Sequence, residues 1–460
     1  MDVLVIGGGP GGYVASIAAA KRGARVTLVE KDLLGGVCLN RGCIPTKTIL
    51  HSANLFHEAK DFSRLGIVIP PPQLDFATIM RRKDAVVKQL RQGVEFLLGK
   101  AGVTVLRGEA RFLSRDEIAV RTAEGEVKLP AQNVIISTGS APRDLPFARC
   151  DGKNVIHSDH ALELDSLPKS MVIIGGGVIG CEFAQAFVRM GVRVTMLELL
   201  PALLSAMDAD QSALIQRVLK KDGVALHLSC DVNAVTDTGA GVEVRFTQDG
   251  AQKSIAADKV LIATGRKPVT DGLDAQAAGV ALDARGAIPV DAMCRTNVEG
   301  VYAIGDVTGG VQLAHVASHQ GVIAAENLFG AQEELDERVI PNCVYTSPEL
   351  ASMGYTQAQA QKAGYQIKTG IFPASANGRS LIEGVRDGFS KVVADGASGT
   401  ILGLHLAGPN VTEMISPFGA AIKFDAAAED FAGVIFAHPT VSEMVHESIL
   451  DIDKKAIHKA

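Results

Sequence analysis

Residues 2–12 read DVLVIGGGPGG, and residues 170–180 read SMVIIGGGVIG. Each stretch is a short apolar strand that runs into G-x-G-x-x-G, and the small or apolar residues after it are typical of a helix. A strand, a glycine-rich turn and a helix in this order are typical of dinucleotide-binding domains of the Rossmann type. The sequence therefore predicts two such domains. Their motif glycines are Gly7, Gly9 and Gly12 and, 168 residues later, Gly175, Gly177 and Gly180.

An acidic residue follows each glycine motif at the same distance. GARVTLVE ends at Glu30 and GVRVTMLE ends at Glu198, each 18 residues past the third glycine. The glycine turn lets the backbone and the helix N-terminus approach a pyrophosphate. The carboxylate accepts hydrogen bonds from a ribose 2′-hydroxyl and would repel a 2′-phosphate. Both sites are therefore expected to prefer a dinucleotide with a free 2′-hydroxyl.

A second sequence motif also occurs twice. VIISTGSAP (134–142) and VLIATGRKP (260–268) are each an apolar strand followed by Thr-Gly. Each lies downstream of one glycine motif, so we interpret each as the end of a nucleotide-binding unit, with Thr138, Gly139 and Gly265 near the ligand. A generic strand and turn is the alternative.

Cys38 and Cys43 lie close together in KDLLGGVCLNRGCIPTK (31–47). On a regular helix their Cα atoms would be about 8.6 Å apart, whereas a disulfide needs roughly 4.4–6.8 Å. Irregular backbone is therefore expected between them, which Gly42 permits. Pro45 is suited to open a helix, which places Cys43 just before a helix N-terminus, where the dipole lowers the pKa of a thiol.

We interpret this cysteine pair as redox-active. Unrelated buried thiols or a metal site are the alternatives, although no second Cys pair or Cys/His cluster nearby supplies further ligands, so no metal is expected. The other cysteines are scattered singly and are expected to be ordinary reduced thiols: Cys150, Cys181, Cys230, Cys294 and Cys343.

Length and charge narrow the class of protein. A chain of 460 residues requires more than one core. The formal charge of −6 and the lack of a Lys/Arg-rich run argue against a nucleic-acid partner. The chain has no apolar run of about 18 residues, so the sequence predicts no membrane-spanning helix. Asp2 stands where a signal peptide would have basic residues, which argues against a signal peptide. A cytoplasmic location is expected.

Among the 11 histidines, His438 has a distinctive context. Pro439 restricts the local backbone, and Glu443 follows five residues after the histidine. A carboxylate on one ring nitrogen would fix the tautomer and raise the basicity of the other nitrogen. A structural role is the alternative for His438, and His446 and His458 are expected to be surface residues.

Motifs along essentially the whole chain resemble those of the pyridine nucleotide–disulfide oxidoreductases. GGVCLNRGCIPTK resembles the redox-active disulfide motif of this family, with Val37 where threonine would be expected. The other similar stretches are VYAIGDV (301–307) for the second flavin motif, LAHVASHQG (313–321) for the helix beneath the flavin, AHPTVSE (437–443) for the catalytic His–Glu pair, and 340–354 and 403–415 for the interface domain.

The resemblance implies an α/β fold with two Rossmann-like dinucleotide-binding domains plus a C-terminal α+β dimerisation domain. FAD would occupy the first glycine motif and NAD the second. The expected parts are an FAD-binding domain (1–143), an NAD-binding domain (144–266), a central segment that returns to the FAD domain (267–336) and an interface domain (337–460).

The resemblance also assigns roles to single residues. Lys47 would lie near the flavin and pair with Glu182. Asp306 would bind the ribityl chain, and Ala314, at the helix start beneath the flavin, would also bind the cofactor. The backbone at Ala110 and the backbone at Val232 would lie beside the adenosine groups of the two dinucleotides.

The implied activity is oxidation of protein-bound dihydrolipoamide with reduction of NAD⁺. Cys38 and Cys43 would exchange with the substrate, while His438 acts as general base and Glu443 orients it. The histidine would come from the partner subunit of a homodimer, and the substrate from a lipoyl-bearing protein of a 2-oxoacid dehydrogenase or glycine cleavage system. Another NAD(P)H-dependent disulfide or metal-ion reductase and a non-catalytic FAD-binding scaffold are the alternatives.

Overall fold

The repeated motif forms the same three elements in both copies. The computed structural model describes residues 1–459. The elements are β1 (Asp2–Ile6), α1 (Pro10–Lys21) and β2 (Arg25–Glu30) in the first copy, and β10 (Ser170–Ile174), α6 (Val178–Arg189) and β11 (Arg193–Leu197) in the second. All three elements start at the same offset of 168 residues that relates the glycines.

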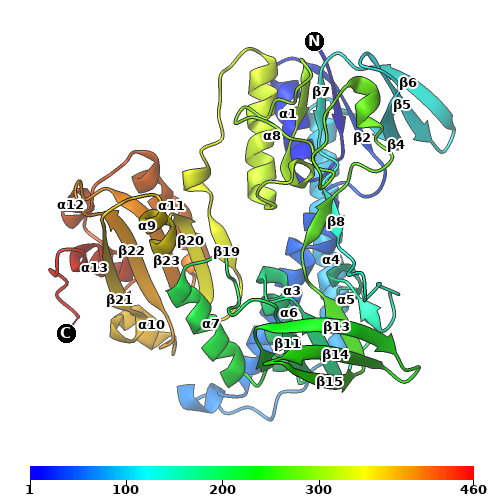
Figure 1. Cartoon of the computed structure of the whole chain (residues 1–460). Helices are drawn as coiled ribbons and strands as arrows, with labels where there is room; N and C mark the ends of the chain where they lie inside the picture. Colours follow the sequence, from blue (N-terminus) through cyan, green and yellow to red (C-terminus); the bar gives the residue numbers. More distant parts are fainter. Residues whose placement is uncertain (460) are drawn as a thin grey trace.

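Five parallel strands form the first sheet, with α1 packed beside α8 (Ala314–Leu328). In spatial order they are β18 (Val301–Ala303), β7 (Val134–Ile136), β1, β2 and β3 (Thr104–Arg107). An antiparallel sheet of β4 (Glu109–Phe112), β5 (Glu117–Thr122) and β6 (Gly125–Pro130) lies next to it in Figure 1. The strand β18 comes from far along the chain, so the chain returns to this sheet after building the second one.

The second sheet repeats this plan. Its parallel strands, in spatial order, are β12 (Ala225–His227), β11, β10, β16 (Lys259–Ile262) and β9 (Val155–Ile156). Its antiparallel companion consists of β13 (Cys230–Asp237), β14 (Val242–Gln248) and β15 (Ala251–Ala257). The helices α5 (Ser158–Ala161) and α7 (Ala209–Lys221) belong to this part. The two halves are joined by an antiparallel pair, β8 (Ser140–Pro142) and β17 (Arg266–Pro268).

The C-terminal part is an antiparallel sheet with helices, drawn in yellow, orange and red in Figure 1. Its strands, in spatial order, are β19 (Asn342–Val344), β20 (Glu349–Gly354), β23 (Ile401–Gly408), β22 (Phe389–Asp395) and β21 (Ile367–Pro373). Its helices are α9 (Gln357–Lys362), α10 (Gly378–Ile382), α11 (Val411–Lys423), α12 (Ala428–Ala432) and α13 (Glu443–Asp451). The expected fold class is confirmed.

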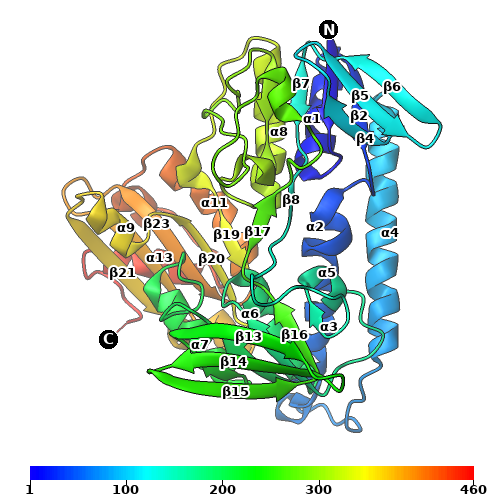
Figure 2. The ribbon, with the colours of Figure 1, turned by 45° about the vertical axis from the view of Figure 1, so that its right-hand side comes forward.

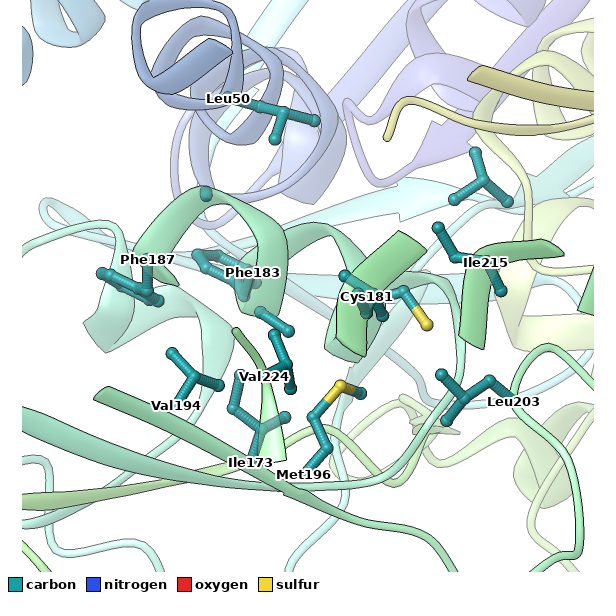
Figure 3. Close-up of a cluster of buried hydrophobic side chains, with 14 of the residues drawn as sticks. Leu50, Ile173, Cys181, Phe183, Phe187, Val194, Met196, Leu203, Ile215 and Val224 are labelled. Carbon is teal, nitrogen blue, oxygen red and sulfur yellow. The ribbon is translucent and has the colours of Figure 1, made fainter. Parts of the chain in front are cut away.

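Three helices of the first half bring the cysteines to the second half. They are α2 (Gly36–Arg41), α3 (Cys43–Ala59) and the long α4 (Phe76–Lys100), which runs along one side of the molecule in Figure 2. Leu50 of α3 is 1% exposed and belongs to the same buried cluster as Phe183 and Phe187 of α6 (Figure 3), whose rings lie 5.8 Å apart. This apolar contact fixes the cysteine-bearing helix against the second dinucleotide unit.

Over residues 1–459, the structure contains no helix with both the length and the apolar character needed to cross a membrane.

Candidate active site

The first and third glycine of each motif are required by close packing. Gly7 has φ +102°, and a Cβ placed on Gly12 would lie 1.7 Å from the carbonyl oxygen of Gly7. The second copy is built in the same way, since Gly175 has φ +112° and a Cβ on Gly180 would lie 2.0 Å from the oxygen of Gly175. Any side chain at these positions would push the helix away from its strand.

The middle glycines instead face open space. A Cβ on Gly9 would meet nothing nearer than 3.8 Å, and one on Gly177 would meet nothing within 4 Å. Each glycine is the N-cap residue of a 12-residue helix, so unpaired backbone N–H groups surround this space. A pyrophosphate fits such a cradle, because its charge faces the helix dipole and the backbone N–H groups.

The two acidic residues are held in the same way at both motifs. Glu30 accepts hydrogen bonds from the backbone N–H of Gly8 at 2.6 Å and of Asp32 at 2.6 Å. Glu198 accepts from the equivalent glycine and from the N–H of Leu200, the latter at 2.7 Å. Both carboxylates are therefore fixed beside the glycine turn, at the position where a ribose hydroxyl can donate to them.

One cleft of about 1560 Å³ joins the two cradles and the cysteines. Most residues expected to bind cofactor line it: Gly7, Gly9, Glu30, Lys47, Ala110, Thr138, Gly139, Asp306, Ala314, Gly175, Gly177, Glu182, Glu198, Val232 and Gly265. The third glycine of each motif faces its own turn instead. The cleft is large and two-ended, which fits two extended dinucleotides that meet near the thiols.

The cysteines lie on either side of a break between two helices. Cys38 lies within α2, and Cys43 is the first residue of α3. Gly42 separates the helices, and a Cβ there would come within 3.0 Å of the Val37 carbonyl oxygen and 3.2 Å of Cys38 Cα. The irregular backbone expected from the spacing is present, and it brings the thiols within hydrogen-bonding reach of each other.

The shared hydrogen bond gives the two thiols opposite acidities. The thiol of Cys38 donates toward Cys43 and lowers the pKa of Cys43 to about 7, with help from the charge of Lys47 and against the effect of burial. The same hydrogen bond and burial raise the pKa of Cys38. Cys43 is therefore the thiolate of the reduced pair, and Cys38 keeps its proton.

Lys47 is anchored one turn into the helix that begins at Cys43. Its Nζ lies 2.7 Å from Glu182 Oε2, and this carboxylate is 2% exposed. The other oxygen of Glu182 accepts the backbone N–H of Tyr345 at 3.0 Å, and the Lys47 ammonium lies 4.8 Å from the centre of the Tyr345 ring. The structure thus brings Lys47 and Glu182 together and adds Tyr345, for which no local spacing gave a signal.

Asp306 belongs to a polar chain that joins the two halves of the molecule. Its Oδ2 accepts a hydrogen bond from the Ser140 hydroxyl, whose oxygen in turn accepts from Arg266 Nε at 2.7 Å. Thr138 donates to the carbonyl of Val269 at 2.6 Å. Sequence reasoning missed Ser140 and Arg266, although both stand within the repeated Thr-Gly phrases.

The His–Glu pair lies elsewhere. His438 Nδ1 is 2.9 Å from Glu443 Oε1, and Glu443 Oε2 accepts the N–H of Thr440 at 2.8 Å. Burial raises the pKa of Glu443, but the hydrogen bonds from Thr440 and His438 outweigh it and lower the pKa overall. The His438 side chain is 78% exposed, and neither residue of the pair lines the cleft described above. Within one chain, the pair and the cysteines are therefore separate.

One expectation about the other histidines was wrong, because His446 is half-buried and stacks on the Phe436 ring at 4.8 Å. His458 is exposed, as expected, and its Nδ1 lies 2.6 Å from Glu447 Oε1. Cys150 is a free thiol, as expected, and two histidines lie beside it.

Two dinucleotide cradles that open onto one pair of coupled thiols define a dinucleotide-dependent thiol–disulfide oxidoreductase. Comparison with known proteins agrees. The family model described as pyridine nucleotide-disulphide oxidoreductase matches residues 1–321, and the model for the dimerisation domain of these proteins matches residues 340–449. The chain belongs to this family and is a flavoprotein that uses FAD and NAD.

Relatives support the assignment over the full length. The chain is 41% identical to a dihydrolipoyl dehydrogenase of Bacillus subtilis, covering 100% of both chains, and 41% identical to the mitochondrial dihydrolipoyl dehydrogenase of Pisum sativum, covering 99% of this chain and 92% of the relative. The crystal structure of LpdA from Mycobacterium tuberculosis matches with a TM-score of 0.92 and 29% identity, covering 98% of this chain and 99% of that one. The HOCl-induced flavoprotein disulfide reductase RclA from Escherichia coli, as its Cu(II) complex, matches with a TM-score of 0.86 and 30% identity over 97% and 98%.

Proposed function

We propose that the protein oxidises a protein-bound dihydrolipoyl group to lipoyl and reduces NAD⁺. The observation that carries the proposal is the close approach of Cys38 and Cys43 at the break between α2 and α3, in a cleft that also contains both dinucleotide cradles. Full-length relatives named dihydrolipoyl dehydrogenase support this choice of substrate over other disulfides.

The first half of the reaction is a thiol–disulfide exchange. A thiolate of the dihydrolipoyl group attacks the sulfur of Cys38 in the Cys38–Cys43 disulfide, and Cys43 leaves as a thiolate. The second substrate thiol then loses its proton and attacks the substrate sulfur of the mixed disulfide, which closes the lipoyl ring and frees Cys38. The substrate loses two electrons and two protons, and the protein disulfide gains the electrons. Cys43 suits the leaving role because a thiol of low pKa leaves faster.

His438 is the proposed base for the substrate thiols. Its Nδ1 faces Glu443, so Nε2 remains free to accept a proton. Because His438 is exposed, lies within the dimerisation domain and does not line its own chain's cleft, we propose that it completes the cleft of the partner subunit in a homodimer. Each active site would then need two chains.

The bound cofactors would be FAD in the first cradle, with Gly7, Gly9 and Glu30, and NAD in the second, with Gly175, Gly177 and Glu198. When bound, they supply the two-electron acceptors that return the reduced cysteines to the disulfide. Lys47 would hold its charge near Cys43 and the flavin, and Asp306 would bind the ribityl chain.

The expected domain boundaries at 143, 266 and 336 are retained as a proposal. The pairing of β8 with β17 supports the first two, because the chain passes between the two sheets at this ribbon. The lipoyl-bearing partner from a 2-oxoacid dehydrogenase or glycine cleavage system and the cytoplasmic location also remain predictions.

A steady-state comparison tests the proposal. Dihydrolipoamide with NAD⁺, and lipoamide with NADH, should be turned over, whereas glutathione disulfide with NADH or NADPH should not. Cys38→Ser should abolish turnover while leaving flavin bound. Preferred reduction of glutathione disulfide would overturn the substrate assignment, and failure of NADH to bleach the flavin would indicate a non-catalytic scaffold.

A further inference from the structure

A second cluster of metal-ligating side chains lies away from the redox cysteines. Donor atoms of Cys150, His157 and His160 all lie within 4.8 Å of one another, and Cys150 Sγ is 3.7 Å from His160 Nδ1. None of these three residues lines the cleft that contains Cys38 and Cys43. The cluster is formed by the loop after β8, which carries Cys150, and by the start of α5, which carries the two histidines, where the chain enters the second dinucleotide unit.

The loop is folded so that the thiol faces the two imidazoles. Asp151 Oδ1 accepts the backbone N–H groups of Lys153, Asn154 and Val155 at 2.7, 2.9 and 3.0 Å, which turns the chain directly after Cys150. The chain then enters β9, which pairs with β16, and His157 follows at the start of α5. The donors are therefore positioned by a strand and a helix start rather than by a free loop.

His157 gives the cluster an unused donor atom. The residue is 9% exposed, and its Nε2 is buried without a hydrogen-bond partner. A buried polar atom without a partner is costly, and a bound cation would satisfy it.

Asp144 brings a carboxylate to the same place. Its Oδ1 lies 3.1 Å from His157 Nε2 without the geometry of a hydrogen bond, and it accepts the backbone N–H of Cys150 at 3.1 Å. In a tetrahedral zinc site, bonds of about 2.0–2.3 Å place the donor atoms roughly 3.3–3.6 Å apart. The Cys150–His160 separation of 3.7 Å lies close to that range, and all separations among Cys150, His157 and His160 are within 4.8 Å, so small movements would bring these three donors onto one ion. Asp144 contacts His157 but lies outside this group of three donors.

We propose that Cys150, His157 and His160 bind one Zn²⁺ ion. One thiolate and two imidazoles form a donor set that suits zinc better than magnesium or calcium, which prefer oxygen alone. Burial raises the pKa of the Cys150 thiol, so zinc would displace a proton as it binds.

The alternative is that these side chains only cap a helix. The N–H of His157 points at His160 Nδ1 over 3.4 Å, a long contact at the start of the four-residue helix α5. Because Nδ1 has one lone pair, zinc binding requires this contact to break. A hydrogen bond of this length is weak, so its loss costs little free energy compared with the gain from a metal–nitrogen bond.

Equilibrium dialysis of the oxidised FAD-loaded enzyme against buffered Zn²⁺ tests the proposal. The Cys38–Cys43 pair is closed in this form and cannot bind the metal. We expect one zinc per chain in the unmodified enzyme, and at least tenfold weaker binding in Cys150→Ser and in His157→Gln. Cys343→Ser, which changes another half-buried thiol, serves as the matched control and should keep the zinc.

Zinc-edge X-ray absorption identifies the ligands of the bound ion. One sulfur at about 2.3 Å and nitrogen or oxygen at about 2.0–2.1 Å are expected, and the sulfur should disappear in Cys150→Ser. Absence of stoichiometric zinc in the unmodified enzyme, equal binding by both variants, or a coordination shell without sulfur would overturn the site and leave the cluster as a helix cap. This outcome is independent of turnover, so it does not depend on the proposed reaction.

Discussion

Cys38 and Cys43 have identical side chains, but their positions in the structure favour the thiol form of Cys38 and the thiolate form of Cys43 in the reduced enzyme. Cys43 begins a helix, accepts the hydrogen bond of its neighbour and feels the charge of Lys47, all of which favour its thiolate. Cys38 donates that hydrogen bond and is buried, which favours its thiol. This difference favours attack of the substrate on Cys38, because Cys43 has the lower pKa and is therefore the better leaving thiolate.

Removing the charge of Lys47 should make Cys43 less acidic. The pKa of Cys43 is lowered to about 7, so in the reduced enzyme its thiolate predominates above that pH and is lost below it. In Lys47→Met, the loss of the nearby cation should raise this pKa and move the pH midpoint of alkylation by iodoacetamide upward. Lys60→Met, at the other end of α3, is the control and should not move the midpoint. An unchanged midpoint in Lys47→Met would show that the hydrogen bond from Cys38 alone sets the acidity.

Glu443 should control the basicity of His438. In Glu443→Gln the charged acceptor at 2.9 Å from Nδ1 becomes neutral, so the histidine becomes a weaker base and its tautomer is less well fixed. Turnover with dihydrolipoamide should fall by about 10²-fold or more, and the acidic limb of the pH–rate profile should shift toward lower pH. His458→Gln removes the other His–Glu contact of this region and should have little effect on turnover. Equal losses in both variants would indicate a structural role for Glu443.

The break between α2 and α3 brings the cysteines together. On one continuous helix the two thiols would be too far apart to bond. Gly42 allows the break because its missing side chain leaves room for the Val37 carbonyl and for Cys38 Cα. The two cysteines therefore come close together because the chain breaks at Gly42 between α2 and α3, and not because of the cysteine side chains themselves.

Gly42→Ala should disturb this boundary. Its Cβ would lie 3.0 Å from Val37 O and 3.2 Å from Cys38 Cα, so we expect a loss of about 1–3 kcal/mol in the free energy of unfolding from overpacking. The Cys38–Cys43 disulfide should also form more slowly, as measured by thiol titration during reoxidation. Gly93→Ala is the matched control, because no atom lies within 4 Å of the new Cβ and alanine favours the surrounding helix α4. A Gly42→Ala protein as stable as this control would show that the backbone relaxes freely.

Features of the site that depend on short stretches of sequence could be predicted, whereas contacts between segments far apart in the chain could not. The glycine motifs, Glu30, Glu198 and the break near Gly42 follow from spacing over a few tens of residues, and the structure shows each arrangement. The contact of Lys47 with Tyr345 joins segments almost 300 residues apart, and no local pattern specifies it. The cluster at Cys150 was missed for a different reason: its spacing matches no common metal motif, and a turn built by Asp151 creates it.

At the scale of the whole molecule, the residues of the proposed active site lie in different parts of one chain, because His438 and Glu443 do not line the cleft that contains the cysteines. Figure 1 shows α13, which begins at Glu443, in the C-terminal part on the left, and α3, which begins at Cys43, beside α6 of the second dinucleotide unit. The match of residues 340–449 to a dimerisation domain suggests how the distance is closed. In a twofold dimer, each C-terminal part can face the cleft of the other subunit, and both sites are then completed at once.

Complementation between two inactive variants tests this arrangement. Cys43→Ala and His438→Ala homodimers should each lack nearly all turnover, because every site contains one defective residue. After subunit exchange, a heterodimer has one site with both changes and one site with neither, so a random mixture should recover about a quarter of the unmodified rate. A Cys43→Ala, Cys38→Ala double variant mixed with His438→Ala should recover equally, because both cysteine changes fall in the same defective site. If differently tagged subunits are shown to have exchanged and no activity returns, His438 acts within its own chain, and the C-terminal part must then move toward the cysteines during turnover.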